Sequence, residues 1–149
     1  MKGGAYGASA GNDGMSGIFT FSSYRDPNIV RTLNVWREAL QFFVDNPVGT
    51  EELLLAKIGT VAREIRPLVP AEAGMVAFRR WMYGISDEMR QKKRNELMRT
   101  QPKDLSAAAK RLLSALEDSY SVVIAGPEMV DKEASAHPDF TPVRKQLSV

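Results

Sequence analysis

Apolar positions near the start of the chain follow the short period of strands. Small residues alternate around one aromatic over residues 3–10, and residues 11–14, Gly-Asn-Asp-Gly, form a turn signal. Residues 17–24 are then rich in β-branched and aromatic side chains. This order predicts a β-hairpin with a loop of several residues.

After the hairpin, apolar residues recur every three or four positions, the spacing of one face of a helix. Asp26 is the expected N-cap of the first helix and Pro27 its first residue, where the missing N–H costs nothing. Thr50 and Ser86 are expected caps of later helices, and Gly84 is the expected residue after a helix end. The pattern predicts helices over residues 27–43, 50–65, 71–83, 86–99 and 102–116, and a short one from 127.

Residues 120–125 form a short apolar run that predicts one more strand, suited to a central position in a sheet. The element order predicts an α+β fold, a two-layer sandwich of a small, mostly antiparallel sheet with helices on one face. Because the hairpin begins at residue 3 without a lead-in, we expect further strands before Met1 and an incomplete domain. Residues 1–149 are expected to form a single domain, with an extended tail over 137–149.

Composition and charge narrow the classes of function. The 149 residues, 44% apolar and 26% charged, are typical of a water-soluble globular domain. A net charge of +2 favours neither a nucleic-acid nor a membrane partner. The absence of cysteine excludes disulfides and thiolate sites, and no apolar run approaches the roughly 20 residues that span a bilayer. The N-terminus lacks the layout of a secretory signal, so we expect a cytoplasmic location.

Candidate chemistry within the chain is sparse. His137 is the only histidine, which excludes a two-histidine zinc site and most triads within this chain, and we expect it at the surface. The basic cluster at 79–99 is interleaved with acidic residues and is expected to be the solvated face of two helices. Carboxylates lie at helix starts, where capping explains them. We therefore expect no catalytic residue and no metal ligand in this chain.

The glycine-rich strand is the segment that a plain structural role explains least well. Glycines 3, 4 and 7 are poor strand formers and indicate a strand that another backbone or a ligand approaches closely. No helix follows directly and no Lys-Ser/Thr closes the loop, so the segment is neither a P-loop nor a dinucleotide fingerprint. A tight strand and a peptide-binding strand with Tyr6 as its contact both stay open.

Several segments together resemble one family. GGAYG at residues 3–7 and FTFSSYRDP at 19–27 resemble the last domain of the pitrilysin/insulinase-like zinc metallopeptidases, in particular the presequence protease and falcilysin branch. Residues 70–94 resemble a helix pair of that branch, and residues 121–146 its closing strand and tail. The resemblance therefore covers much of the chain.

The resemblance implies an enzyme of four related α+β domains in two halves that close around an unfolded peptide. Its zinc motif, His-x-x-Glu-His, lies in the first domain and is absent here, so zinc is expected in an N-terminal half and no cofactor in this chain. The last domain supplies an Arg and a Tyr to the substrate. Tyr6 matches that Tyr, the Arg would lie immediately before Met1, and Gly3 and Gly4 would leave room for a bound peptide.

We therefore expect the substrate-binding C-terminal part of a zinc-dependent metalloendopeptidase that degrades unfolded peptides. It would be truncated, split into a separate subunit or mis-started as a reading frame. Its expected partners are an N-terminal zinc-bearing half and an extended peptide. The alternative is a non-catalytic interaction or assembly domain with the same fold, and an anion-binding helical domain built on residues 79–99 is a third hypothesis. An open sheet edge also predicts self-association.

Overall fold

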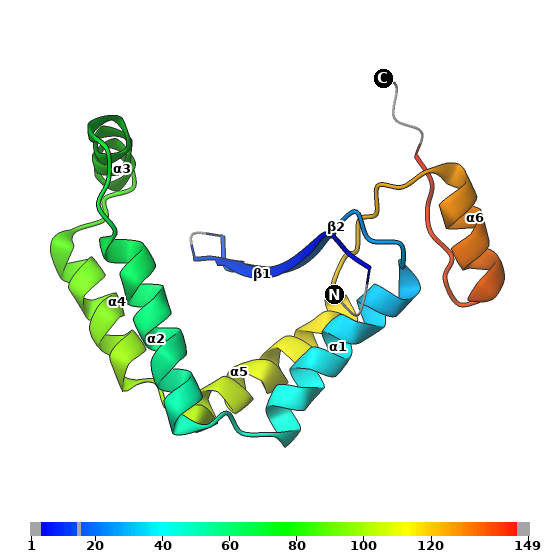
Figure 1. Cartoon of the computed structure of the whole chain (residues 1–149), viewed down its shortest axis with the longest axis horizontal. Helices are drawn as coiled ribbons and strands as arrows, with labels where there is room; N and C mark the ends of the chain where they lie inside the picture. The colour runs from blue at the N-terminus through cyan, green and yellow to red at the C-terminus, as the bar shows by residue number, and fades with distance from the viewer. Residues whose placement is uncertain (1–3, 15, 146–149) are drawn as a thin grey trace. The chain divides into compact units, whose positions relative to one another are not determined.

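A computed structural model describes residues 4–14 and 16–145, and in it one β-hairpin precedes a series of helices (Figure 1). The prediction of a small α+β fold is confirmed. In chain order the elements of the described residues are β1 (Gly7–Asp13), β2 (Ile18–Tyr24), α1 (Val30–Asp45), α2 (Thr50–Ile65), α3 (Pro70–Met82), α4 (Asp87–Arg99), α5 (Pro102–Ala115), a single 3-10 turn (Leu116–Asp118) and α6 (Pro127–Ala136).

Two compact units make up the chain. One is formed by Met1–Gln41 together with Leu113–Val149, and it contains the hairpin and α6. The other is Phe42–Leu112, and it contains α2, α3 and α4.

The hairpin of the first unit is antiparallel, but the predicted place of its loop is wrong, because residues 11–13 of the turn signal are paired within β1 and the chain reverses after Asp13. β1 pairs with β2 from Gly7 opposite Tyr24 to Asp13 opposite Ile18. At the loop, the Gly17 amide donates to the Asp13 carbonyl at 2.9 Å, and Gly17 has a φ of +71°, which a residue without Cβ adopts readily. The predicted hairpin is therefore confirmed.

One side of the hairpin packs on α1. The ring of Phe21 in β2 stacks on that of Trp36 in α1, with centroids 5.6 Å apart and planes 14° apart. Ile29 and Leu40, which share the predicted apolar stripe with Trp36, are 5% and 6% exposed. Trp36 stacked on the hairpin and the buried Leu40 show that the apolar face of α1 is partly covered, as an amphipathic helix requires.

The predicted third strand at residues 120–125 is wrong. None of the described segments pairs with this run, and the described sheet contains β1 and β2 alone. Tyr120, Val122 and Ile124 are 98%, 88% and 84% exposed. An apolar run forms a strand only where a neighbouring strand completes its backbone hydrogen bonds, and the described residues supply no such neighbour.

The predicted start of the first helix is also wrong. α1 begins at Val30, so Pro27 lies outside the helix and Asp26 is not its N-cap. The Val30 amide instead donates at 3.0 Å to the carboxylate of Glu133 in α6. Asp26 accepts from the Asn28 amide at 3.0 Å, as aspartates do in turns. The free amide at the start of α1 is thus bound by a carboxylate from a distant segment, where the sequence predicted a cap from a neighbouring residue.

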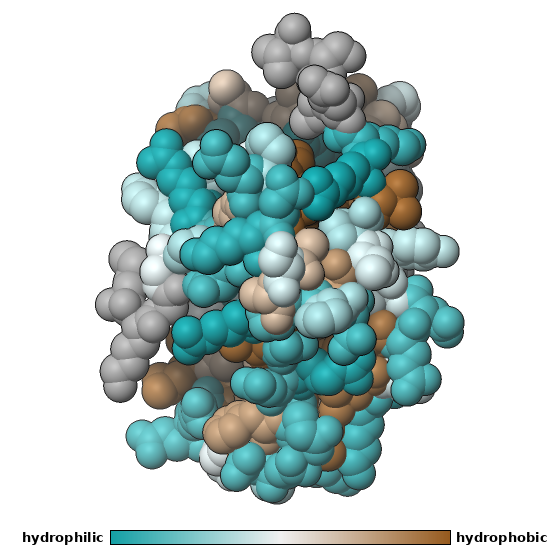
Figure 2. Space-filling model, turned by 90° about the vertical axis from the view of Figure 1, so that its right-hand side faces the viewer, coloured by the Kyte–Doolittle hydropathy of each residue, from teal (hydrophilic) through white to brown (hydrophobic). Residues whose placement is uncertain are grey.

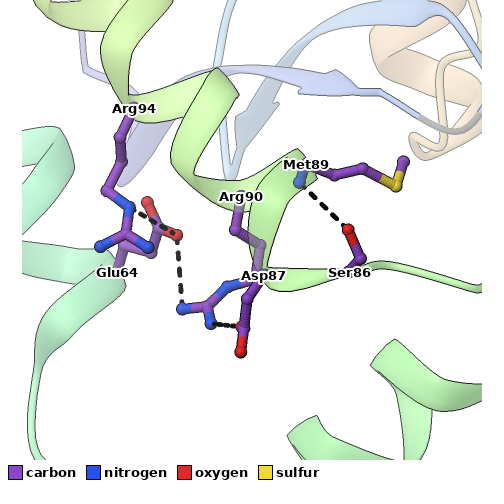
Figure 3. A network of polar contacts seen from close by, with 6 residues as sticks. All are labelled: Glu64, Ser86, Asp87, Met89, Arg90 and Arg94. Atoms are coloured by element: carbon purple, nitrogen blue, oxygen red, sulfur yellow. Dashed lines mark hydrogen bonds and ion pairs between the residues drawn. The ribbon is translucent and has the colours of Figure 1, made fainter.

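Of the other predicted helix ends, those at Ser86 and Gly84 are confirmed, and the one at Thr50 is wrong. The Ser86 hydroxyl accepts from the Met89 amide at 3.2 Å at the start of α4 (Figure 3), and Gly84 follows α3 with a φ of +62°, so both predictions are confirmed. Thr50, by contrast, is the first helical residue, and Gly49 precedes it without a side-chain cap. Both residue types suit a helix start, and spacing alone did not separate them.

The second unit is held by polar contacts as well as by a small core. Leu53 and Ala109 are its buried apolar residues, at 6% and 4% exposure, within the described chain. The Lys57 ammonium donates to the Met98 carbonyl at 2.9 Å, close to the C-terminal end of α4, where a cation is favourable. On the face that Figure 2 shows, seen from the right-hand side of Figure 1, apolar surface lies exposed among polar side chains.

An ion-pair cluster joins α2 to α4. The Glu64 carboxylate lies 3.7 Å from the Arg90 guanidinium and 3.9 Å from Nε of Arg94, and Arg90 also pairs with Asp87 at 2.8 Å (Figure 3). The side chains of Glu64, Arg90 and Arg94 are 31%, 21% and 27% exposed. Because they are partly shielded from water, removing one partner leaves a poorly solvated charge, which costs more than breaking an ion pair on an open surface.

Replacing Glu64 by Ala is expected to lower the free energy of unfolding by about 1 to 2 kcal/mol, because it leaves two half-buried guanidinium groups without their shared carboxylate. Lys92→Ala is the control, because its pair with Glu96 is exposed and worth about 0.5 kcal/mol or less. Urea titration of both variants measures the difference. Equal losses in the two would show that the Glu64 cluster contributes no more than a surface pair.

Candidate functional site

Tyr6 lies directly before β1 with its backbone fixed and its side chain in solvent. Its amide donates to the Tyr24 carbonyl at 3.0 Å, directly beyond the last paired residues of the hairpin. Its side chain is 70% exposed. The rings of Tyr6 and Tyr24 meet edge to face, with centroids 6.0 Å apart and planes at 86°. The phenol is thus held on a defined backbone while it stays accessible to a partner.

The glycines before Tyr6 have different positions in the structure. Gly3 lies outside the described residues. Gly4 has a φ of +85°, and a Cβ placed on it would come within 2.9 Å of Cγ of Pro27. A Cβ on Gly7 would meet no described atom within 4 Å. The close approach at Gly4 therefore comes from this chain's own Pro27, and a glycine is required there before any ligand is considered.

The turn after β2 places Arg25 beside Tyr6. Arg25 has a φ of +48° and is the one non-glycine among the described residues with a positive φ. Its guanidinium carbon lies 5.9 Å from the centre of the Tyr6 ring and 5.4 Å from that of Tyr24, within the range of cation–aromatic attraction. Sequence reasoning missed this contact. The contact arises beyond the last register pair, Gly7–Tyr24, where the Tyr6 amide binds the Tyr24 carbonyl, and no local sequence signal marks it.

Asp26 anchors this turn to the start of α1. Its carboxylate accepts from the Thr32 hydroxyl at 2.7 Å and from the Asn28 amide at 3.0 Å. Partial desolvation raises the pKa of the Asp26 carboxyl and is the largest single influence on it. Hydrogen bonds from Thr32, Asn28 and Ser23 together outweigh it, so the pKa lies below its ordinary value.

Asp26→Asn is expected to destabilise the fold in a pH-dependent way. Because the pKa is lower in the folded chain, the carboxylate contributes stability above the unfolded value of about 3.9 and loses it as the pH falls through the folded value. The urea midpoints of the wild type and the variant should differ at pH 7, and the difference should shrink as the pH falls through the lowered pKa of Asp26. Thr32→Val, which removes one donor, should reproduce part of the effect. A difference independent of pH would contradict this account.

The other candidates do not form a second site. His137 ends α6 with its amide bound to the Glu133 carbonyl at 2.9 Å and its side chain exposed, which confirms its prediction as a surface residue. The basic cluster at 79–99 is not one surface, because Arg90 and Arg94 turn toward Glu64 (Figure 3). Across residues 4–14 and 16–145, no group of three or more His, Cys, Asp or Glu is placed to hold a metal ion.

Comparison with protein families shows which family the segment around Tyr6 belongs to. A model described as the PreP C-terminal domain matches residues 1–127. The chain belongs to the PreP C-terminal domain family. The resemblance drawn from GGAYG and SYRDP to the presequence protease branch is therefore confirmed, and Tyr6, Arg25 and Asp26 all lie within the matched range.

Curated relatives of this PreP C-terminal domain are much longer proteins. Presequence protease 1, chloroplastic/mitochondrial, of Arabidopsis thaliana is 33% identical over 147 residues, which cover 99% of this chain and 14% of that protein. Presequence protease, mitochondrial, of Xenopus laevis is 36% identical over 127 residues, 85% of this chain and 12% of that protein. The protein of the same name from Schizosaccharomyces pombe is 33% identical over 127 residues, with the same shares. The chain thus spans 12 to 14% of these relatives.

No helix of the described segments combines the length and apolar character that crossing a membrane requires.

Proposed function

We propose that this chain is the substrate-binding C-terminal part of a zinc-dependent metalloendopeptidase that degrades unfolded peptides. The observation that carries the proposal is the placement of Tyr6, whose side chain is 70% exposed on a hairpin-fixed backbone inside the segment that matches the PreP family. Relatives named presequence proteases support the general kind of activity. The whole domain, residues 1–149 with a tail over 137–149, would serve this one purpose.

An extended peptide would bind alongside β1. Every residue of β1 is exposed, and among the described residues only β2 pairs with it, so its second edge can accept a further strand. A peptide added there would pass near Tyr6. The Tyr6 hydroxyl would then donate to the scissile carbonyl and stabilise the charge that develops on its oxygen. Gly3 and Gly4 stay the proposed residues that give the peptide backbone room, although Pro27 already requires a glycine at position 4.

The family implies a zinc ion that the residues of this chain do not fit. Across the described ranges no cluster of carboxylate or imidazole side chains could hold it, and the sequence contains no His-x-x-Glu-His. The proposal therefore assigns zinc and the activation of water to an N-terminal half. What this chain contributes is the binding and orientation of the peptide.

Exposed apolar groups support a partner. Tyr120, Val122 and Ile124 offer an unpaired apolar segment, and burying it would remove a cost of exposure to water. The N-terminal half of the protease is the proposed partner. The competing proposal is that the chain associates with itself through the open edge of its sheet. The names of the relatives place those proteins in mitochondria or chloroplasts, so a cytoplasmic location for this chain stays a prediction.

Hydrolysis of an unfolded peptide tests the proposal directly. This chain alone, an N-terminal half from the same source alone, and their mixture would be assayed with zinc present. We expect cleavage in the mixture only. If the two parts form a complex by light scattering and yet cleave nothing, the proposal fails and the non-catalytic assembly domain is favoured. Full activity of the N-terminal half by itself would equally overturn it.

A further inference from the structure

We propose that Arg25 is a positioning residue that holds the Tyr6 ring in the orientation needed to meet a substrate carbonyl, an inference that rests on the proposed function of Tyr6. The guanidinium carbon of Arg25 lies 5.9 Å from the Tyr6 ring and 5.4 Å from the Tyr24 ring. With the edge-to-face contact between the two rings at 6.0 Å, the three side chains contact one another pairwise. An exposed Tyr would otherwise sample several rotamers.

The backbone at Arg25 is arranged for this contact at a conformational cost. Its φ of +48° lies in the left-handed region, which side chains with a Cβ avoid. Such a conformation persists only where its surroundings impose it. Here the next residue, Asp26, is tied to Asn28 and to Thr32 of α1, while the preceding carbonyl, that of Tyr24, accepts from Tyr6. The turn is thus fixed on both sides of Arg25.

Arg25 has no competing electrostatic partner in the described chain. None of the described carboxylates forms an ion pair with it, although Asp26 is its immediate neighbour, because that carboxylate is committed to Asn28 and Thr32. Its guanidinium lies instead over the faces of two aromatic rings, the arrangement that the ring quadrupole favours. Holding Tyr6 in advance would reduce the ordering that must occur when the peptide binds.

A double-mutant cycle in the reconstituted protease tests the coupling. Arg25→Gly removes the guanidinium and keeps a residue that accepts the positive φ, whereas Tyr6→Phe removes the hydroxyl and keeps the ring. We expect Arg25→Gly to lower kcat about 10-fold or more with KM changed less than about twofold, since a misplaced group costs turnover more than binding. In the Tyr6→Phe background the same change should cost less than about twofold. Arg25→Lys should restore part of kcat.

The outcomes separate this inference from the proposed function. If Tyr6→Phe lowers activity and Arg25→Gly adds its full effect to it, Arg25 acts independently of Tyr6 and the inference is overturned. An unchanged kcat in Arg25→Gly overturns it too. If Tyr6→Phe itself has no effect, the proposed function fails instead, and the catalytic part of this inference falls with it.

The contact itself can be measured without activity. In the full chain labelled with ¹³C-arginine, the δ-methylene protons of Arg25 should be shifted upfield by the ring currents of the two tyrosines. Tyr6→Leu should remove part of that shift, while Lys92→Ala, which changes neither tyrosine, should leave it unchanged. An unshifted Arg25 signal in the wild type would overturn the inference, whatever the kinetics show.

Discussion

Tyr6→Phe is expected to lower kcat/KM of the reconstituted protease about 100-fold or more, the effect of removing one donor to a developing oxyanion. The substitution deletes a single oxygen from a side chain that is 70% exposed. The ring and its edge-to-face contact with Tyr24 are kept. Because no described group depends on the hydroxyl, the free energy of unfolding should change by less than about 0.5 kcal/mol. Steady-state kinetics and urea titration of the same variant measure the two quantities.

Tyr24→Phe supplies a matched control for this experiment. It makes the same chemical change on the neighbouring ring, whose side chain is 59% exposed and whose centroid lies 6.0 Å away. Its kcat/KM should stay within about twofold of the wild type, because the proposed carbonyl contact belongs to Tyr6 alone. Equal losses in the two variants would show that the pair of rings, and not the Tyr6 hydroxyl, matters. No loss in Tyr6→Phe would remove the assigned role.

Leu53→Ala is expected to destabilise the second unit by about 2 to 3 kcal/mol, the lower part of the range for buried leucines. Leu53 lies near the start of α2 and is 6% exposed, one of the few apolar side chains in the described chain that is shielded to this degree. Its truncation removes buried methyl groups and leaves a cavity that the neighbouring helices fill only in part. The lower value is expected because much of the apolar surface around this small core is already in water.

Leu55→Ala in the same helix is the control for that loss. Leu55 is 65% exposed, so the same truncation should cost less than about 0.5 kcal/mol. Urea unfolding followed by far-UV circular dichroism measures both variants, and helix propensity cancels because the substitution is the same. A similar loss in the two would mean that the exposure of α2 in the folded protein differs from the one described, for instance because a partner covers Leu55.

The elements that the sequence predicted well are those whose signals are local. A hydroxyl at Ser86 reaches an amide three residues on, and Gly84 supplies a positive φ directly after α3, so both helix ends follow from the residues beside them. The hairpin likewise follows from two short runs that lie close together in the sequence, although its loop lies later than the turn signal at residues 11–14. The GGAYG segment also led to the family without any tertiary information.

The features that were wrong or missed depend on residues far apart in the chain. The start of α1 is set by Glu133, which lies 103 positions away from Val30. Residues 120–125 carry an apolar strand signal, but a strand also needs a neighbour, which no local pattern supplies.

The sequence by itself determined the family, the helical stripes, the hairpin and Tyr6 as the candidate residue, because each depends on spacing or on a short motif. Only the tertiary structure decided that Gly4 lies against Pro27 and that Arg25 lies against Tyr6. The reason is that these contacts arise where the ends of a hairpin meet after folding. Which side chains face one another there depends on strand register and on one left-handed turn, and neither is visible in the composition or periodicity of the chain.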